Sequence, residues 1–168
     1  MKKLILVIVV LAIVGIVWLK SDQIEPVEGK ETVKVGVVIP LTGPRADAGE
    51  FSKNALTLAA EEINSNLELK YKLEFIYEDT KYEPLVAVSA VRKLLDLDQV
   101  HYFIGPYGSS EVMAAAPIAE EAKRIMILTG AQSEEISQLG DYIFRIIHNS
   151  AQEAPIFAKF VAEKMGSA

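Results

Sequence analysis

The residues best suited to bind a small molecule lie between Tyr102 and Ser110, in the stretch Tyr-Phe-Ile-Gly-Pro-Tyr-Gly-Ser-Ser. A short apolar run, a glycine- and proline-rich turn and an alanine-rich pattern follow one another here, which predicts a strand, a tight turn and a helix. Ligands of open α/β sheets bind beyond the carboxyl ends of the strands, where backbone N–H groups are unpaired. Ser109 and Ser110 can cap the helix and also offer hydroxyl and N–H groups to a carboxylate. The stretch therefore predicts half of a binding cleft.

The sequence lacks the usual signatures of catalysis and of cofactor binding. Residues 40–44 stand where a dinucleotide-binding protein has Gly-x-Gly-x-x-Gly, and no Gly-x-x-x-x-Gly-Lys-Ser/Thr pattern occurs. Residues 108–110 lack the flanking pattern of a nucleophile elbow. The chain has no cysteine, and its two histidines, His101 and His148, are far apart in sequence. We therefore expect a binding protein that is not an enzyme and that needs no metal or cofactor.

The charge of the chain argues against a nucleic-acid partner. The net charge is −6, and residues 21–168 alone contain 14 basic and 23 acidic residues. Affinity for nucleic acid comes mostly from clustered lysine and arginine, which this sequence does not contain.

The first 31 residues differ in character from the rest. Sixteen uncharged residues, 4–19, lie between Lys3 and Lys20, and as a helix they would be about 24 Å long, against about 30 Å for the hydrocarbon core of a bilayer. Residues 1–20 therefore predict a signal peptide or a membrane anchor, and the absence of an Ala-x-Ala cleavage site favours the anchor. The lysines at the start should stay in the cytoplasm, which places everything downstream outside it. Residues 21–31 predict a polar tether.

From residue 32 onward, short apolar runs alternate with amphipathic segments. The predicted strands are 33–39, 73–77, 102–104, 125–128 and 142–147. The predicted helices are 51–63, a segment beginning at 83, a segment beginning at 109, 134–139 and 151–165. This alternation predicts a doubly wound, Rossmann-like parallel sheet with helices on both faces. The chain ends after a helix, where the alternation would continue with a strand, so we expect a longer protein.

Three packing details also follow from the helical patterns. Helix 51–63 carries apolar residues on two sides, one of them with Phe51 and Leu58, so only a charged edge should be left exposed. Pro117 falls inside a helical pattern and should kink or break it. The buried stripe of the second helix is expected at Leu85, Val88, Val91 and Leu95.

Three segments in this order resemble a known family. They are VKVGVVIPLTGPRADAGEFSKNALTLAAEEIN, YEDTKYEP and FIGPYGSSEVMAAAPIAEEAKRIMILTGA. Together they resemble the N-terminal lobe of type I periplasmic binding proteins, in the branched-chain amino acid (Leu/Ile/Val) binding family of ABC importers. The similarity covers residues 32 to about 165, so 32–168 is expected to be the first lobe of a ligand-binding domain.

The resemblance implies a set of ligand-binding residues. In this family two lobes close on an amino acid, and the first lobe holds its α-carboxylate and α-amino group. The serine on the turn after the third strand corresponds to Ser109, with Tyr107 and Gly108 lining the pocket. The loop after the fourth strand corresponds to residues 130–133, in which Gly130, Ala131 and Gln132 are the expected contacts and Ser133 is an alternative hydroxyl. An aromatic residue of the family falls at about Ala48, a departure that puts branched-chain specificity in doubt.

The resemblance also implies a function. We expect an extracytoplasmic solute-binding protein that delivers an amino acid or similar small carboxylate to ABC permease subunits, held at the membrane through residues 4–19. The alternative is an extracellular sensor domain of the same fold, whose closure signals to a partner. An enzyme on this fold is a third reading that would need a base or nucleophile from elsewhere.

Overall fold

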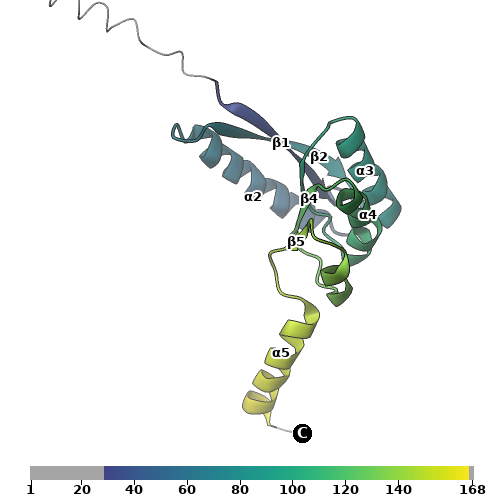
Figure 1. Cartoon of the computed structure of the whole chain (residues 1–168). Helices are drawn as coiled ribbons and strands as arrows, with labels where there is room; N and C mark the ends of the chain where they lie inside the picture. The colour runs from purple at the N-terminus through teal and green to yellow at the C-terminus, as the bar shows by residue number, and fades with distance from the viewer. Residues whose placement is uncertain (1–28, 167–168) are drawn as a thin grey trace, which may run out of the picture. The chain divides into compact units, whose positions relative to one another are not determined.

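The computed structural model describes residues 29–166 (Figure 1). The predicted anchor at 1–20 and most of the predicted tether at 21–31 lie outside the described residues and stay predictions. Within residues 29–166, no helix combines the length and apolar character needed to cross a bilayer.

Strands and helices alternate along the described chain. The strands are β1 (Glu31–Ile39), β2 (Tyr71–Asp79), β3 (Tyr102–Ile104), β4 (Ile125–Leu128) and β5 (Ile143–Arg145). The helices are α2 (Ala46–Ser65), α3 (Pro84–Asp96), α4 (Ser109–Glu121), the 3-10 helix η1 (Glu134–Gln138) and α5 (Ser150–Met165). Every predicted strand is present, although β5 is shorter than expected and β1 and β2 are longer.

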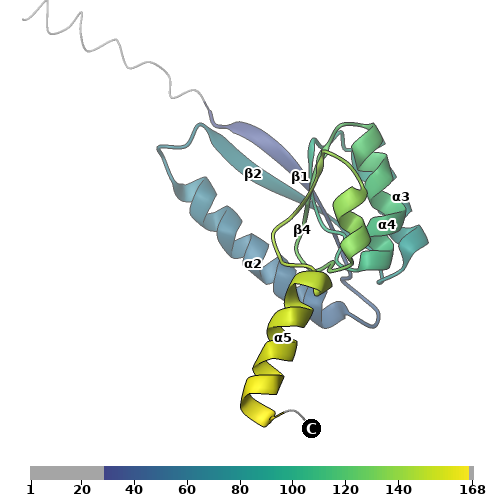
Figure 2. The same cartoon turned by 60° about the horizontal axis from the view of Figure 1, so that its bottom comes forward.

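The five strands form one parallel sheet in the order β2-β1-β3-β4-β5. Helix α2 lies on one side of the strands, and α3 and α4 lie together on the other (Figures 1 and 2). The predicted doubly wound α/β fold is thus confirmed. From β1 the chain crosses outward to β2 and then returns past β1 to β3, so the winding direction changes between β1 and β3. Such a switch point is where open α/β sheets bind ligands.

The hydrophobic core lies between the sheet and helices α3 and α4. Phe103, Met126 and Leu128 project into it from the strands and are fully buried. On α3 the buried residues are Ala87, Ala90, Val91 and Leu94. The expected stripe was wrong at Leu85, which is 80% exposed. Leu85 is two positions before Ala87, and two helical steps of about 100° each turn its side chain to the opposite side of the helix.

The other two packing expectations are wrong about the exposed side of α2 and about a break at Pro117. Phe51 and Leu58 are 71% and 67% exposed, and Ala48 and Gly49 are the only residues of α2 that are buried. Pro117 does not break α4, which runs through it from Ser109 to Glu121. Val112, Ala115, Ala116 and Ala119 of α4 are fully buried, and this burial outweighs the cost of about 3 kcal/mol for an internal proline.

Helix α5 differs from the other helices. It begins at a capping box in which the side chain of Asn149 accepts a hydrogen bond from the Gln152 N–H, and none of its residues is buried. In both views it extends away from the sheet (Figures 1 and 2).

Candidate ligand-binding site

The turn after β3 brings the backbone of two central strands together. Gly105 has a φ of +90°, and a Cβ at this position would lie 2.0 Å from the carbonyl oxygen of Val38 on β1. Only glycine tolerates both the positive φ and this close approach. The turn, whose Gly105–Pro106 peptide is cis, therefore lies directly against the carboxyl end of β1 and delivers the following residues to the switch point.

The start of α4 has an unusual cap. Gly108 is the N-cap residue, so the prediction that a serine caps this helix is wrong. The Gly108 N–H donates a 2.8 Å hydrogen bond to Oε2 of Glu111, whose side chain is fully buried. The N–H groups of Ser109 and Ser110, in the first turn, have no acceptor within the helix. These N–H groups and the positive end of the helix dipole favour a bound anion.

The loops after β3 and β4 meet at the predicted residues. The N–H of Ser133 donates a 3.2 Å hydrogen bond to the Ser109 Oγ. The ring of Tyr107 packs against Gly130, where an added Cβ would lie 2.6 Å from the ring. In this contact the Ser109 hydroxyl is the acceptor, so its own proton can still be donated to another group. Four of the predicted residues, Tyr107, Ser109, Gly130 and Ser133, therefore lie together.

The other two predicted residues of the β4 loop contact protein groups. The Gln132 side chain donates a 3.0 Å hydrogen bond to Glu153 Oε1, and the backbone carbonyl of Gln132 accepts one of 3.1 Å from the Ser150 N–H. Ala131 is 1% exposed. The backbone carbonyl of Ala131 also accepts a hydrogen bond, from Arg145 Nη1 at 3.5 Å.

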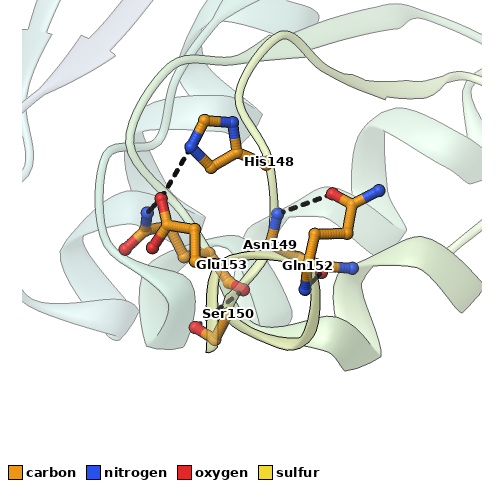
Figure 3. A network of polar contacts seen from close by, with 6 residues as sticks. His148, Asn149, Ser150, Gln152 and Glu153 are labelled. Carbon is orange, nitrogen blue, oxygen red and sulfur yellow. Dashed lines mark hydrogen bonds and ion pairs between the residues drawn. The ribbon is translucent and has the colours of Figure 1, made fainter. Parts of the chain in front are cut away.

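A polar network joins the β4 loop to the start of α5 (Figure 3). Glu153 accepts from Gln132 and also pairs with His148, whose Nε2 lies 2.8 Å from Glu153 Oε1. Asn149 and Gln152 cap the helix beside this pair. The network thus links the loop after β4 to the start of α5, the segment through which the chain leaves the sheet.

Arg145 of β5 supports the β4 loop from the other side. Its Nη1 donates to the carbonyl of Ser133 at 2.7 Å and to that of Ala131 at 3.5 Å, and its Nη2 donates to the Ser137 Oγ at 2.7 Å. Sequence reasoning missed this residue, since an arginine within a short strand carries no signal that it will fold back onto a preceding loop.

Asp79 supports the loop after β1. Its Oδ1 accepts from the N–H groups of Leu41 (2.9 Å), Thr42 (3.1 Å) and Lys81 (2.9 Å), and its Oδ2 accepts from the Thr42 hydroxyl. Burial works to raise the pKa of Asp79, but the hydrogen bonds from the Thr42 side chain and these N–H groups outweigh it and hold the pKa below 3.8. The Asp79 carboxylate thus ties the loop after β1 to the end of β2.

The loop held by Asp79 ends at Arg45, which reaches across the switch point. Arg45 Nη2 donates a 3.1 Å hydrogen bond to the Tyr107 hydroxyl, and its guanidinium carbon lies 5.2 Å from the centre of the Tyr107 ring. Ala48, three residues further on, lies in the first turn of α2, not in a loop as expected, and is 7% exposed. Its predicted place in the pocket wall stays a prediction.

Other parts of the described chain are weaker candidates for a ligand or metal site. A hollow of about 820 Å³ lies at the opposite edge of the sheet, lined by residues such as Lys34, Tyr71 and His101, and it contains none of the predicted residues. Nowhere between residues 29 and 166 do three His, Cys, Asp or Glu side chains come together as metal ligands. At the carboxyl edge, by contrast, the Ser109 hydroxyl and the first N–H groups of α4 lie together with the loop after β4.

Comparison with known proteins identifies the class. A family model described as Periplasmic binding protein matches residues 32–168, and the chain belongs to this family of solute-binding proteins. Within it, the relatives place the chain in type I, in the branched-chain amino acid group. The leucine-, isoleucine-, valine-, threonine-, and alanine-binding protein of Pseudomonas aeruginosa is 31% identical over 136 residues, which are 80% of this chain and 36% of that protein.

Two solved structures show the same fold with different ligands. A branched-chain amino acid transporter substrate binding protein from Streptococcus pneumoniae, in complex with isoleucine, matches with a TM-score of 0.74 and 26% identity, over 80% of this chain and 39% of that chain. An ABC transporter solute binding protein from Rhodopseudomonas palustris, in complex with 3,4-dihydroxy benzoic acid, gives 0.73 and 29%, over 79% and 36%. The chain therefore spans less than two fifths of the length of these relatives and corresponds to about one lobe.

Proposed function

We propose that this chain is the lobe of an extracytoplasmic solute-binding protein that holds the carboxylate of an amino acid or a similar small carboxylate for an ABC importer. The observation that carries the proposal is the contact between Ser109 and Ser133. It brings the Ser109 hydroxyl, whose proton is free to be donated, to the N-terminal end of α4, where the first N–H groups of the helix are unpaired. Hydrogen bonds from such donors to a carboxylate are charge-assisted and therefore strong.

The second wall of the cleft would come from another lobe of the full-length protein. Relatives of this chain are more than twice its length, and closure of two lobes around a ligand is a common movement among binding proteins. The network around Glu153 supports this reading, because it ties the β4 loop to the segment through which the chain leaves the sheet. A movement of that segment would change the position of Gln132, which lies beside the site.

The proposal includes the location of the protein and its partner. Residues 4–19 would hold it at the outer face of the cytoplasmic membrane, and residues 21–31 would act as a tether between the membrane and the folded lobe. From this position it would deliver its ligand to permease subunits in the same membrane.

Replacement of Ser109 tests the proposal. In the full-length protein, S109A should weaken carboxylate binding by about 1 to 3 kcal/mol, measured by calorimetry with L-leucine, L-glutamate and 4-hydroxybenzoate. The matched control is S89A, because Ser89 is an exposed serine of α3 that bonds only its own helix. Equal affinity in S109A and wild type would refute the role of Ser109. If no small carboxylate binds the wild-type protein, the proposed function itself is wrong.

A further inference from the structure

Arg45 and Tyr107 form a second cluster of hydrogen-bond donors beside the one at Ser109. Arg45 Nη2 donates to the Tyr107 hydroxyl at 3.1 Å. The hydroxyl, as the acceptor, keeps its own proton for another partner. In the described part of the chain, Nη1 of Arg45 has no hydrogen-bond acceptor, and Nε has only Asp47, at 3.7 Å. The cluster thus has donors to spare and carries a positive charge.

The two residues stand on opposite sides of the switch point. Arg45 ends the loop after β1, and Tyr107 lies in the turn after β3, the neighbouring strand. Tyr107 is also two residues before Ser109 and packs on Gly130 of the β4 loop. The cluster therefore lies beside the two loops that carry Ser109 and Gly130.

The ion pair with Asp47 does not neutralise this cluster effectively. The Arg45 and Asp47 side chains are 42% and 66% exposed, and their 3.7 Å separation is long for an ion pair. Exposed pairs of this kind contribute little, because water screens them. Tyr107, by contrast, orients the guanidinium and is itself half-buried.

An aliphatic ligand side chain would suit this cluster poorly. Covering a guanidinium and a phenol hydroxyl with a hydrocarbon group removes their water and gives no hydrogen bond in return. A carboxylate would accept from the arginine and from the Tyr107 hydroxyl together, and arginine matches carboxylate geometry well.

We propose that Arg45 and Tyr107 form a second anion-binding point, and that the ligand of this protein carries two acidic groups. One would bind at Ser109 and the other at Arg45, as in an acidic amino acid or a short dicarboxylate. This inference depends on the proposed function, which supplies the first carboxylate position, and it makes Arg45 the residue that selects against branched-chain ligands.

The test uses the full-length protein and three probes in calorimetry: L-leucine, L-glutamate and glutarate. L-leucine and L-glutamate share their α-amino and α-carboxyl groups, so a difference between them reports on the side-chain position. L-glutamate or glutarate should bind at least tenfold more tightly than L-leucine. R45M should weaken the binding of these acidic probes about 10- to 100-fold and should not weaken that of L-leucine, because an aliphatic side chain would no longer cover the guanidinium. R45K should fall between, because lysine keeps the charge but not the two-pronged geometry.

Y107F provides a second variant that keeps the ring packed on Gly130. It removes only the hydroxyl and should weaken the acidic probes more than L-leucine. Tighter binding of L-leucine than of both acidic probes, or an equal loss for all probes in R45M, would overturn the inference while leaving the proposed function intact. If none of the probes nor 4-hydroxybenzoate binds, both the inference and the proposed function are overturned.

Discussion

Replacing Asp79 by alanine should destabilise the protein, because this carboxylate organises the loop after β1. The wild-type carboxylate accepts four hydrogen bonds, three from backbone N–H groups and one from the Thr42 hydroxyl. In D79A these donors lose their acceptor, and the loop 40–45 is no longer tied to the end of β2.

The size of the effect depends on which donors can return to water. Thr42 and Lys81 are exposed, so their N–H groups regain solvent at little cost. The Leu41 N–H is partly buried, and a donor left unpaired in such a place costs about 1 to 3 kcal/mol. We therefore expect D79A to lower the free energy of unfolding by about 2 kcal/mol, the contribution of roughly one charged hydrogen bond.

Urea unfolding followed by circular dichroism measures this change. The matched control is D96A, because Asp96 is an exposed aspartate at the end of α3, and such a surface change should stay within about 0.5 kcal/mol. The pH dependence gives a second readout. The pKa of Asp79 is lower in the folded protein than its unfolded value of 3.8, so its stabilisation is complete above that value and is lost as the pH falls through the folded pKa. The acid loss of stability should therefore be smaller in D79N than in wild type.

Two outcomes would refute this reasoning. A D79A protein as stable as D96A would show that the loop holds itself without the carboxylate. An unchanged acid profile in D79N would show that Asp79 does not titrate with a lowered pKa in the folded state.

Two further changes test the supports of the candidate site. E111A should lower the free energy of unfolding, measured in urea, by about 1 to 3 kcal/mol, because the buried Gly108 N–H loses its acceptor. E111Q should lower it less, since the amide oxygen can still accept this hydrogen bond. Equal losses in the two variants would contradict this reasoning. R145M should accelerate hydrogen exchange at Ser133 and Leu139, because the three hydrogen bonds from the guanidinium to residues 131–137 disappear. Exchange at Phe103 in the core should stay slow. Unchanged exchange at Ser133 would mean that the Ser109 hydroxyl alone holds that loop.

The positions of the strands and the meeting of the two loops followed from the sequence. Runs such as residues 35–39 are too continuous and β-branched for a solvated strand, and glycines follow the third and fourth runs at Gly105 and Gly130. Once the strands are parallel, their carboxyl ends share one edge. The neighbourhood of Ser109 and Ser133 is a consequence of this topology and needed no knowledge of side-chain packing.

Helix faces were harder to predict for a physical reason. The α3 sequence, Pro-Leu-Val-Ala-Val-Ser-Ala-Val-Arg-Lys-Leu-Leu-Asp, is apolar over much of its circumference. Its buried side is therefore decided by close packing, which selects the small Ala87 and Ala90, and not by hydrophobicity, which suggested Leu85. The exposure of Phe51 on α2 likewise depends on what lies beside the helix, information that local periodicity does not contain.

The polar supports of the site could not be foreseen from local patterns. Asp79 and Arg145 bond to groups that folding brings near: Leu41 lies 38 positions from Asp79, and Ser133 lies 12 positions from Arg145. Arg45 is similar, since its partner Tyr107 is 62 positions away. Such contacts become visible only when the loops at the carboxyl edge are placed together.

The direction of β1 has a practical consequence for handling this protein. The strand begins at Glu31 and runs for nine residues to Ile39 at the candidate site, a path of about 30 Å. Anything attached through the N-terminal segment enters the fold at the edge opposite to Ser109 and Arg45. An affinity tag inserted in the loop 40–45 would therefore lie at the candidate site, whereas one joined ahead of β1 would be connected at the opposite end of this strand.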